Sequence, residues 1–149
     1  MKSWKILVPI DGSKQSFRAI DVAAKLAYNS NDELVLLNVI GREQMPEAIR
    51  RFASVEHIDG PPEWQYEHLV AAGILKAGQQ YARNKGIQTI DTRVRHGDPA
   101  KAIVEAASDK SVDMIVMGNR GLGTVKGLAF GSTSQKVSHL APCSVITVT

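Results

Sequence analysis

Short apolar runs alternate along the chain with segments whose apolar residues recur every three or four positions. A run of this kind is typical of a strand that is covered on both faces of a sheet. The apolar runs are WKILVPI at 4–10, LVLLNVI at 34–40, VDMIVMG at 112–118 and CSVITVT at 143–149. A further strand is expected at 88–95, between two segments with helical patterns.

The segments between these strands carry helix signals. Ser13 is a capping residue, and the apolar positions after it recur at spacings of three and four. Asp98 and Pro99 suit the cap and the first position of another helix. Residues 41–62 lack a sustained period and form a variable excursion, with one or two helical turns around 47–52. Helices are therefore expected at about 14–27, 63–84, 99–109 and from Gly131 or Ser132 to His139.

Strands alternate with helices throughout this pattern. Such an order predicts an α/β fold, a doubly wound five-stranded parallel sheet with helices on both faces. With 149 residues, 44% of them hydrophobic, the chain has the size of a single domain. We therefore expect one domain over 1–149, with the 41–62 excursion as part of it.

The composition restricts the function. The 18 basic and 15 acidic residues are scattered, which argues against a nucleic-acid-binding surface. Cys143 is the only cysteine, so an internal disulfide and a cysteine-based metal cluster are excluded. The sequence has no apolar stretch of about 18 residues, and its start lacks a signal-peptide cleavage site. We expect a cytoplasmic protein without a membrane span.

In open parallel sheets the ligand crevice lies beyond the carboxyl ends of the strands, where the strand order reverses. Residues that follow the predicted strands are therefore the candidates for a site. They are Pro9 to Ser13, Val39 to Gly41, His96 to Asp98, and the residues from Met117 onward.

The segment 117–137, MGNRGLGTVKGLAFGSTSQKV, has five glycines in its first fifteen residues. It is either a flexible connection or a loop that approaches a ligand. Glycine allows close approach to a phosphate and a positive φ, so that successive N–H groups can surround one anion. Residues 131–134 begin a helix whose free N–H groups and dipole favour an anion. We therefore expect a phosphate site here.

Two familiar phosphate-binding motifs do not fit this segment. A Walker A loop requires lysine after its second glycine, but Gly118 leads to Gly123 and Thr124 instead. A dinucleotide fingerprint requires a third glycine where Lys126 stands, and it follows the first strand rather than the fourth. Both classes are excluded.

The spacing Gly118-x2-Gly121-x9-Gly131-Ser132 resembles the ATP-binding branch of the universal stress protein family. Other landmarks of that family occur in the same order: ILVPIDGS at 6–13, LLNVI at 36–40, GDPA at 97–100, DMIVMGNRG at 113–121 and PCSVITV at 142–148. The resemblance covers the whole chain. It implies a Rossmann-like fold of the adenine nucleotide alpha hydrolase type and a bound adenine nucleotide, ATP or else AMP or ADP, accompanied by Mg²⁺.

The resemblance also implies roles for individual residues. Asp11 is expected to hold the ribose hydroxyls, with Pro9 beside the sugar and base. Val39 is expected to meet adenine through its backbone, and Met117 to line the same pocket. The phosphates are expected at Gly118, Gly121, Gly131, Ser132, Thr133 and Ser134. Arg120 is either a further phosphate contact or a solvated side chain. No residue is assigned as a catalyst or as a metal ligand.

We therefore expect an ATP-binding stress-response or signalling module rather than an enzyme. A slow ATP hydrolase or an adenylyl-chemistry enzyme on the same fold is the alternative, and a purely structural partner-binding module is a third possibility. The last strand, Cys143 to Thr149, would form an edge of the sheet with unpaired backbone groups. Together with the family resemblance, this predicts a homodimer in which the two copies of the strand meet.

Overall fold

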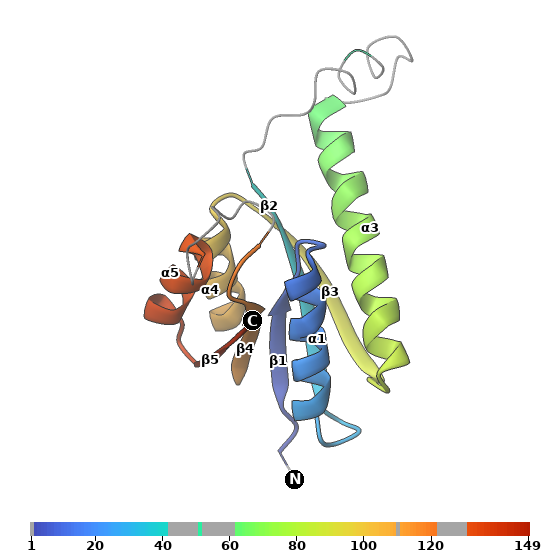
Figure 1. Ribbon diagram of the computed structural model, residues 1–149, viewed down its shortest axis with the longest axis vertical. Coiled ribbons are helices and arrows are strands. Elements are labelled where there is room, and N and C mark those ends of the chain that lie inside the picture. Colours follow the sequence, from blue (N-terminus) through green and yellow to red (C-terminus); the bar gives the residue numbers. More distant parts are fainter. Residues whose placement is uncertain (1, 42–50, 52–61, 110, 122–130) are drawn as a thin grey trace.

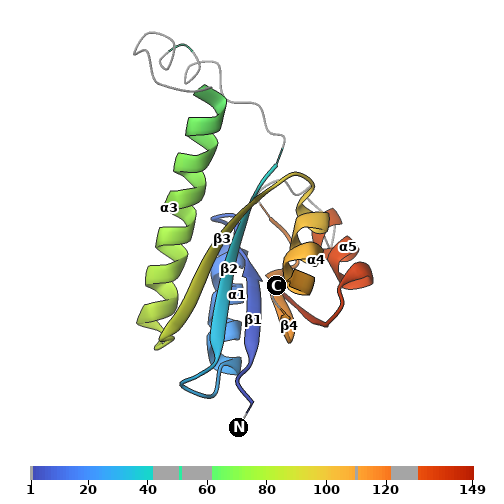
Figure 2. The same ribbon diagram turned by 180° about the vertical axis from the view of Figure 1, so that it is seen from behind.

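The protein is described here by a computed structural model that covers residues 2–41, 51, 62–109, 111–121 and 131–149 (Figure 1). These residues contain a five-stranded parallel sheet in the order β3-β2-β1-β4-β5. The helices α1 and α3 cover one face, and α4 and α5 cover the other, as the two opposite views show (Figures 1 and 2). The doubly wound α/β fold is thus confirmed.

The elements occur in the predicted order, with bounds within two residues of those expected. They are β1 Lys5–Pro9, α1 Lys14–Leu26, β2 Glu33–Ile40, α3 Pro62–Asn84, β3 Thr89–His96, α4 Pro99–Asp109, β4 Met114–Gly118, α5 Ser132–Leu140 and β5 Ser144–Val148. The helical turns expected around 47–52 lie outside the described residues, apart from Arg51. Across the described part of the chain, no helix is long and apolar enough to cross a membrane.

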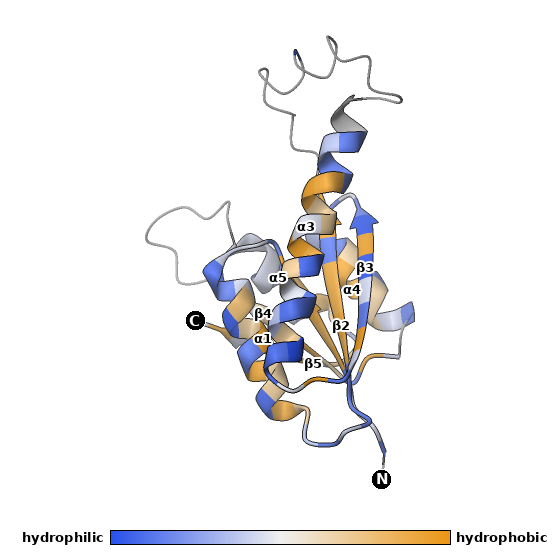
Figure 3. Ribbon diagram, turned by 90° about the vertical axis from the view of Figure 1, so that its right-hand side faces the viewer, coloured by the Kyte–Doolittle hydropathy of each residue, from blue (hydrophilic) through white to orange (hydrophobic). Residues whose placement is uncertain are grey.

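The central strands are buried on both faces, which explains their continuous apolar sequences. Ile6 and Val8 of β1 belong to the core beneath α1 and α3, whereas Leu7 packs in the core beneath α4 and α5. All three side chains are fully buried. Figure 3 shows the central strands as hydrophobic, with most hydrophilic residues on the helices and on β3. β3 is an edge strand, and it is correspondingly more exposed.

The predicted capping residues begin their helices as expected. The Ser13 hydroxyl accepts the N–H of Ser16 at 3.1 Å at the start of α1. The Asp98 carboxylate accepts the N–H of Lys101 at 3.0 Å at the start of α4. After α3, Gly86 takes a φ of +94°, a conformation that favours glycine at a helix C-terminus. Short-range chemistry therefore fixes where these helices begin and end.

Two carboxylates tie the amino ends of the strands together. Asp32, which is 3% exposed, accepts the N–H groups of Trp4 at 2.7 Å and Asn29 at 2.8 Å. Asp113 accepts the N–H of Lys5 at 2.8 Å and an ammonium proton of Lys2 at 3.0 Å. The hydrogen bond from the Trp4 backbone is the main cause that lowers the pKa of Asp32, and the one from the Lys5 backbone lowers the pKa of Asp113. Both carboxylates are therefore ionised structural groups.

Candidate functional site

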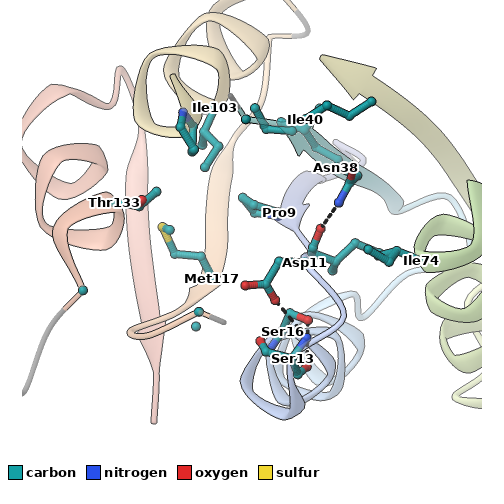
Figure 4. Close-up of a pocket in the computed structure, with 18 of the residues that line it drawn as sticks. Pro9, Asp11, Ser13, Ser16, Asn38, Ile40, Ile74, Ile103, Met117 and Thr133 are labelled. Atoms are coloured by element: carbon teal, nitrogen blue, oxygen red, sulfur yellow. Dashed lines mark hydrogen bonds between the residues drawn. The ribbon is translucent and has the colours of Figure 1, made fainter. Parts of the chain in front are cut away.

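The strand order reverses between β1 and β4, and a cavity of about 540 Å³ lies at the carboxyl ends of β1, β2 and β4. A volume of this size is typical of a small-molecule pocket. Figure 4 shows Pro9, Met117 and Thr133 around the same space. The residues to which the family resemblance assigns a role in the site all line this cavity: Pro9, Asp11, Val39, Met117, Gly118, Arg120, Gly121, Gly131, Ser132, Thr133 and Ser134.

The backbone of Val39 is directed toward the end of β1. The C=O of Leu37 accepts the N–H of Ile10 at 2.8 Å and so faces β1, whereas the C=O of Ile40 accepts the N–H of Gly97 at 3.0 Å on the β3 side. Residues two apart on a strand direct their backbone groups to the same side. The N–H and C=O of Val39 therefore face the space beyond the end of β1. They offer one donor and one acceptor to a ligand in that space.

Asp11 is held in the turn between β1 and α1. Its Oδ1 accepts the N–H of Ser13 at 2.9 Å, and Gly12 between them takes a φ of +87°. A Cβ built on Gly121 would lie 2.5 Å from the other carboxylate oxygen, Oδ2. Gly121 therefore allows the end of β4 to approach the Asp11 carboxylate, and any larger residue there would displace it.

Gly131 brings the start of α5 against the end of β4. Its N–H donates to the C=O of Asn119 at 2.6 Å, and the buried hydroxyl of Ser134 lies 2.9 Å from the same oxygen. A Cβ on Gly131 would lie 3.2 Å from this oxygen, which is closer than side chains normally pack. Glycine at 131 is thus explained by a close approach within the protein.

The positive φ expected for the motif glycines is wrong. Gly131 has φ −73° and ψ 155°, an extended conformation that any residue can adopt. The described glycines with positive φ are Gly12, Gly86 and Gly97. Gly118, Gly121 and Gly131 are therefore required by limited space rather than by backbone dihedral angles.

The N-terminus of α5 faces the cavity. Gly131 caps this helix without any side-chain hydrogen bond. The first N–H groups of a helix have no partner within the helix, and together with the helix dipole they favour an anion. Ser132 and Thr133 line the cavity at this point. The described residues with formal charge in the lining are Asp11, Glu67 and the exposed Arg120, so backbone N–H groups would supply most donors to an anion.

Sequence reasoning missed Asn38, which is a buried residue of the site. Its side chain is 6% exposed, and its Nδ2 donates to the C=O of Ile10 at 2.8 Å (Figure 4). This hydrogen bond fixes the end of β1 beside β2. A polar residue in the middle of the apolar run LVLLNVI was the available signal. The apolar lining residues Ile74 of α3 and Ile103 of α4 gave no such signal, because they fit ordinary helical periodicity.

The candidate stretch His96 to Asp98 lies at the predicted edge of the sheet but not in the cavity lining. Both β2 and β1 lie between β3 and the switch point, and His96 at the end of β3 pairs with Ile40 of β2. The His96 ring packs against the His68 ring of α3, with 5.1 Å between the ring centroids. In the described part of the chain, no group of three or more His, Cys, Asp or Glu residues is arranged to hold a metal ion.

The sheet order and the cavity define a doubly wound α/β protein with a ligand-sized pocket at its switch point. The model of the universal stress protein family matches residues 4–149, and the chain belongs to this family. The family predicted from the glycine motif and the other sequence landmarks is thereby confirmed.

Individual relatives agree with this assignment. The universal stress protein YxiE of Bacillus subtilis is 37% identical over 97% of this chain and 97% of its own length. The structure of UspA from Lactobacillus plantarum is 25% identical with a TM-score of 0.78, over 100% of this chain and 99% of that one. A universal stress protein solved in complex with cAMP is 26% identical with a TM-score of 0.69, over 98% of this chain and 97% of that one.

Proposed function

We propose that this protein binds an adenine nucleotide in the switch-point cavity and acts as a cytoplasmic stress-response or signalling module. ATP is the proposed ligand, with AMP and ADP using the same base and ribose contacts. The observation that carries the proposal is the convergence on one cavity of the residues to which the family resemblance assigns a role, from four separate segments. The similarity to a universal stress protein solved with cAMP supports adenine as the base.

The base would lie against the end of β2. The N–H and C=O of Val39 offer one donor and one acceptor, which suit the edge of adenine. Pro9 and Met117 would contact the base and sugar through apolar atoms. A guanine base presents the opposite pattern of donors and acceptors on this edge, so it would leave polar groups unpaired.

The ribose and phosphates would extend from Asp11 toward α5. The Asp11 carboxylate would accept the ribose hydroxyls, and the N–H groups at the start of α5 would donate to the phosphates. A hydrogen bond to a charged group contributes about 1.5–3 kcal/mol, whereas an exposed helix dipole contributes about 0.3–1 kcal/mol. The individual hydrogen bonds would therefore dominate the affinity. Arg120 at the rim would add positive charge.

Mg²⁺ would accompany the triphosphate rather than occupy a separate protein site. Magnesium ions commonly bind through substrate phosphates, water and one or two carboxylates. Besides Asp11, the proposed ribose acceptor, the described cavity lining supplies one carboxylate, that of Glu67, which fits this mode of binding. The ion would neutralise phosphate charge, which Arg120, the only Lys or Arg among the described residues of the cavity lining, does not balance.

We propose a binding protein rather than an enzyme. The described lining of the cavity holds carboxylates but no histidine, lysine or cysteine. Nucleotide turnover over hours would distinguish the two: multiple turnovers that disappear in Gly131→Val would indicate a slow ATP hydrolase or an adenylyl-transfer enzyme. We further propose a homodimer that pairs through β5, whose outer edge is unpaired among the described strands. The C=O of Val148 accepts the N–H of Asn119, so Val148 and Ile146 direct their backbone groups to β4, whereas Thr147 directs its own to the outer edge. Light scattering of Thr147→Pro, which removes a donor of that edge, should then show a monomer.

The ligand itself is the direct test. Protein purified under gentle conditions should release an adenine nucleotide that mass spectrometry identifies. Calorimetric titration of nucleotide-free protein should show binding of ATP and much weaker binding of GTP. Equal affinity for the two nucleotides, or no binding of either, would contradict the proposed function and favour a purely structural partner-binding module.

A further inference from the structure

One peptide group joins the N-termini of two helices across the proposed nucleotide site. This is the peptide between Asn119 and Arg120, directly after β4. Its C=O accepts the N–H of Gly131 at 2.6 Å, at the start of α5. Its N–H donates to Oε1 of Gln15 at 2.9 Å, in the first turn of α1. Because a peptide group is planar and trans, these two hydrogen bonds point in opposite directions.

Gln15 is in close contact with the start of the glycine segment. A Cβ on Gly118 would lie 3.0 Å from the Cβ of Gln15, so glycine at 118 allows this approach. Gln15 itself is not among the described residues that line the cavity. Its contacts with Gly118 and Arg120 therefore shape the site from outside.

Asn119 has its own anchors, which do not depend on Gln15. Its N–H donates to the C=O of Val148 in β5 at 2.8 Å, and its C=O is held by Gly131. The Arg120 N–H is held from the other side, by Gln15. Without that acceptor the peptide would keep its contact with α5 but lose its contact with α1. The side chain of Gln15 is thus the hydrogen-bonded connection between this peptide and α1.

The two linked helices carry different parts of the proposed site. The turn before α1 holds Asp11, the proposed ribose acceptor, and the start of α5 supplies the proposed phosphate donors. We infer that Gln15 is a positioning residue for the nucleotide site: by accepting the Arg120 N–H, it sets the separation between Asp11 and the N-terminus of α5. This inference rests on the proposed function, because it assigns ribose and phosphate to these two positions.

The inference makes a prediction that depends on the ligand. Adenosine carries no phosphate, so its affinity should be insensitive to the position of α5. AMP must contact both Asp11 and the start of α5 at once, so it should bind more weakly when the separation between these two parts is no longer fixed. Gln15→Met keeps the length of the side chain and removes the acceptor. The affinity for AMP should fall by about three- to tenfold, which is the effect of one hydrogen bond. The affinity for adenosine should stay within about twofold of the parent.

Gln15→Glu separates positioning from simple electrostatics. Glutamate keeps an acceptor oxygen at the same place and adds a negative charge. If charge alone mattered, Gln15→Glu would bind AMP more weakly than Gln15→Met does. If positioning matters, Gln15→Glu should bind AMP more tightly than Gln15→Met does.

Calorimetric titration with AMP and competition with adenosine would measure both affinities for each variant. Gln80→Met is the matched control, since Gln80 is an exposed glutamine whose amide contacts Asn84 on α3. It should bind both ligands like the parent. Thermal unfolding would show that the variants are folded.

The outcomes separate this inference from the proposed function. If the parent binds neither AMP nor adenosine, the proposed function fails. If the parent binds both, three results would overturn the inference. Gln15→Met could bind AMP like the parent, or it could lose as much affinity for adenosine as for AMP. The third is that Gln15→Glu binds AMP no better than Gln15→Met does. Selective loss of AMP affinity with rescue by Gln15→Glu would support it.

Discussion

The two ends of the parallel sheet use their polar groups in opposite ways. At the amino end, Asp32 and Asp113 accept backbone N–H groups from the start of β1, so the polar groups there are satisfied within the protein. At the carboxyl end, the backbone of Val39 and the first turn of α5 face a cavity. Polar groups at the amino end thus stabilise the fold through internal hydrogen bonds, whereas those at the carboxyl end face the cavity, where a ligand can bind them.

The difference follows from the direction of the strands. In a parallel sheet every strand end of one kind meets at the same edge, and the strand order reverses between β1 and β4. The chain therefore diverges to opposite faces after β1 and β4, which opens a space at the carboxyl end. The comparison implies that substitutions at the carboxyl end should change ligand affinity, whereas those at the amino end should change the free energy of unfolding.

The largest effect is expected from Gly131→Val. The branched side chain would push against the C=O of Asn119, from which a Cβ would lie only 3.2 Å away, and would separate β4 from α5. Loss of two or more hydrogen bonds to the charged phosphates would lower the affinity for ATP by more than about a hundredfold. Calorimetric titration would measure this, with circular dichroism to establish the fold.

Gly73→Ala is the matched control for this variant. Gly73 lies within α3, and a Cβ there would meet no atom within 4 Å. This variant should bind ATP like the parent. A folded Gly131→Val protein with parental affinity would show that the close approach of β4 and α5 does not matter for the ligand.

The next largest effect should come from Asp32→Ala, at the opposite end. This change leaves the N–H groups of Trp4 and Asn29 without their acceptor. A hydrogen bond to a charged group contributes about 1.5–3 kcal/mol, and two part-buried ones are lost here, so the free energy of unfolding should fall by at least the lower of these values. Urea unfolding would measure the loss. The affinity of the folded protein for ATP should stay within about twofold of the parent, and a large loss of affinity would contradict the separation of the two ends.

Much of the fold and the position of the site could be predicted from the sequence. Continuous apolar runs predicted strands buried on both faces, and the capping residues Ser13 and Asp98 located helix starts, because both signals depend on neighbouring residues only. The edge of the sheet that holds the site followed from the alternation of strands and helices. The glycine spacing and the other landmarks in family order predicted the family, and the resemblance predicted the residues that converge on the cavity.

Other features could not be predicted, because they depend on contacts between distant parts of the chain. The hydrogen bond from Arg120 to Gln15 joins residues 105 positions apart. The need for glycine at 131 comes from the nearby C=O of Asn119, whereas the sequence suggested a positive φ. Asn38 also became part of the site only once β1 and β2 were placed side by side. Local patterns predict elements, but the spacing between elements decides these contacts.

A smaller effect is expected from pH, again at the amino end. Backbone hydrogen bonds lower the pKa of Asp32 and Asp113 in the folded state. Their stabilising contribution is therefore complete above the unfolded-state pKa of about 3.9 and is lost as the pH falls toward the lower folded-state pKa. The urea midpoint should drop on acidification in this range. The double variant Asp32→Asn and Asp113→Asn should show a shallower drop, and an unchanged acid slope would count against these two carboxylates.

The smallest effect is expected from Val39→Ala, at the carboxyl end. The proposed contact with adenine uses the N–H and C=O of Val39, which every residue except proline retains. Only a few methyl contacts would be lost, so the affinity for ATP should fall by no more than about threefold. Preference for ATP over GTP should persist, because it depends on the backbone donor and acceptor. A calorimetric comparison of both nucleotides on this variant would decide the matter: loss of the ATP preference would show that the side chain of Val39, and not its backbone, recognises the base.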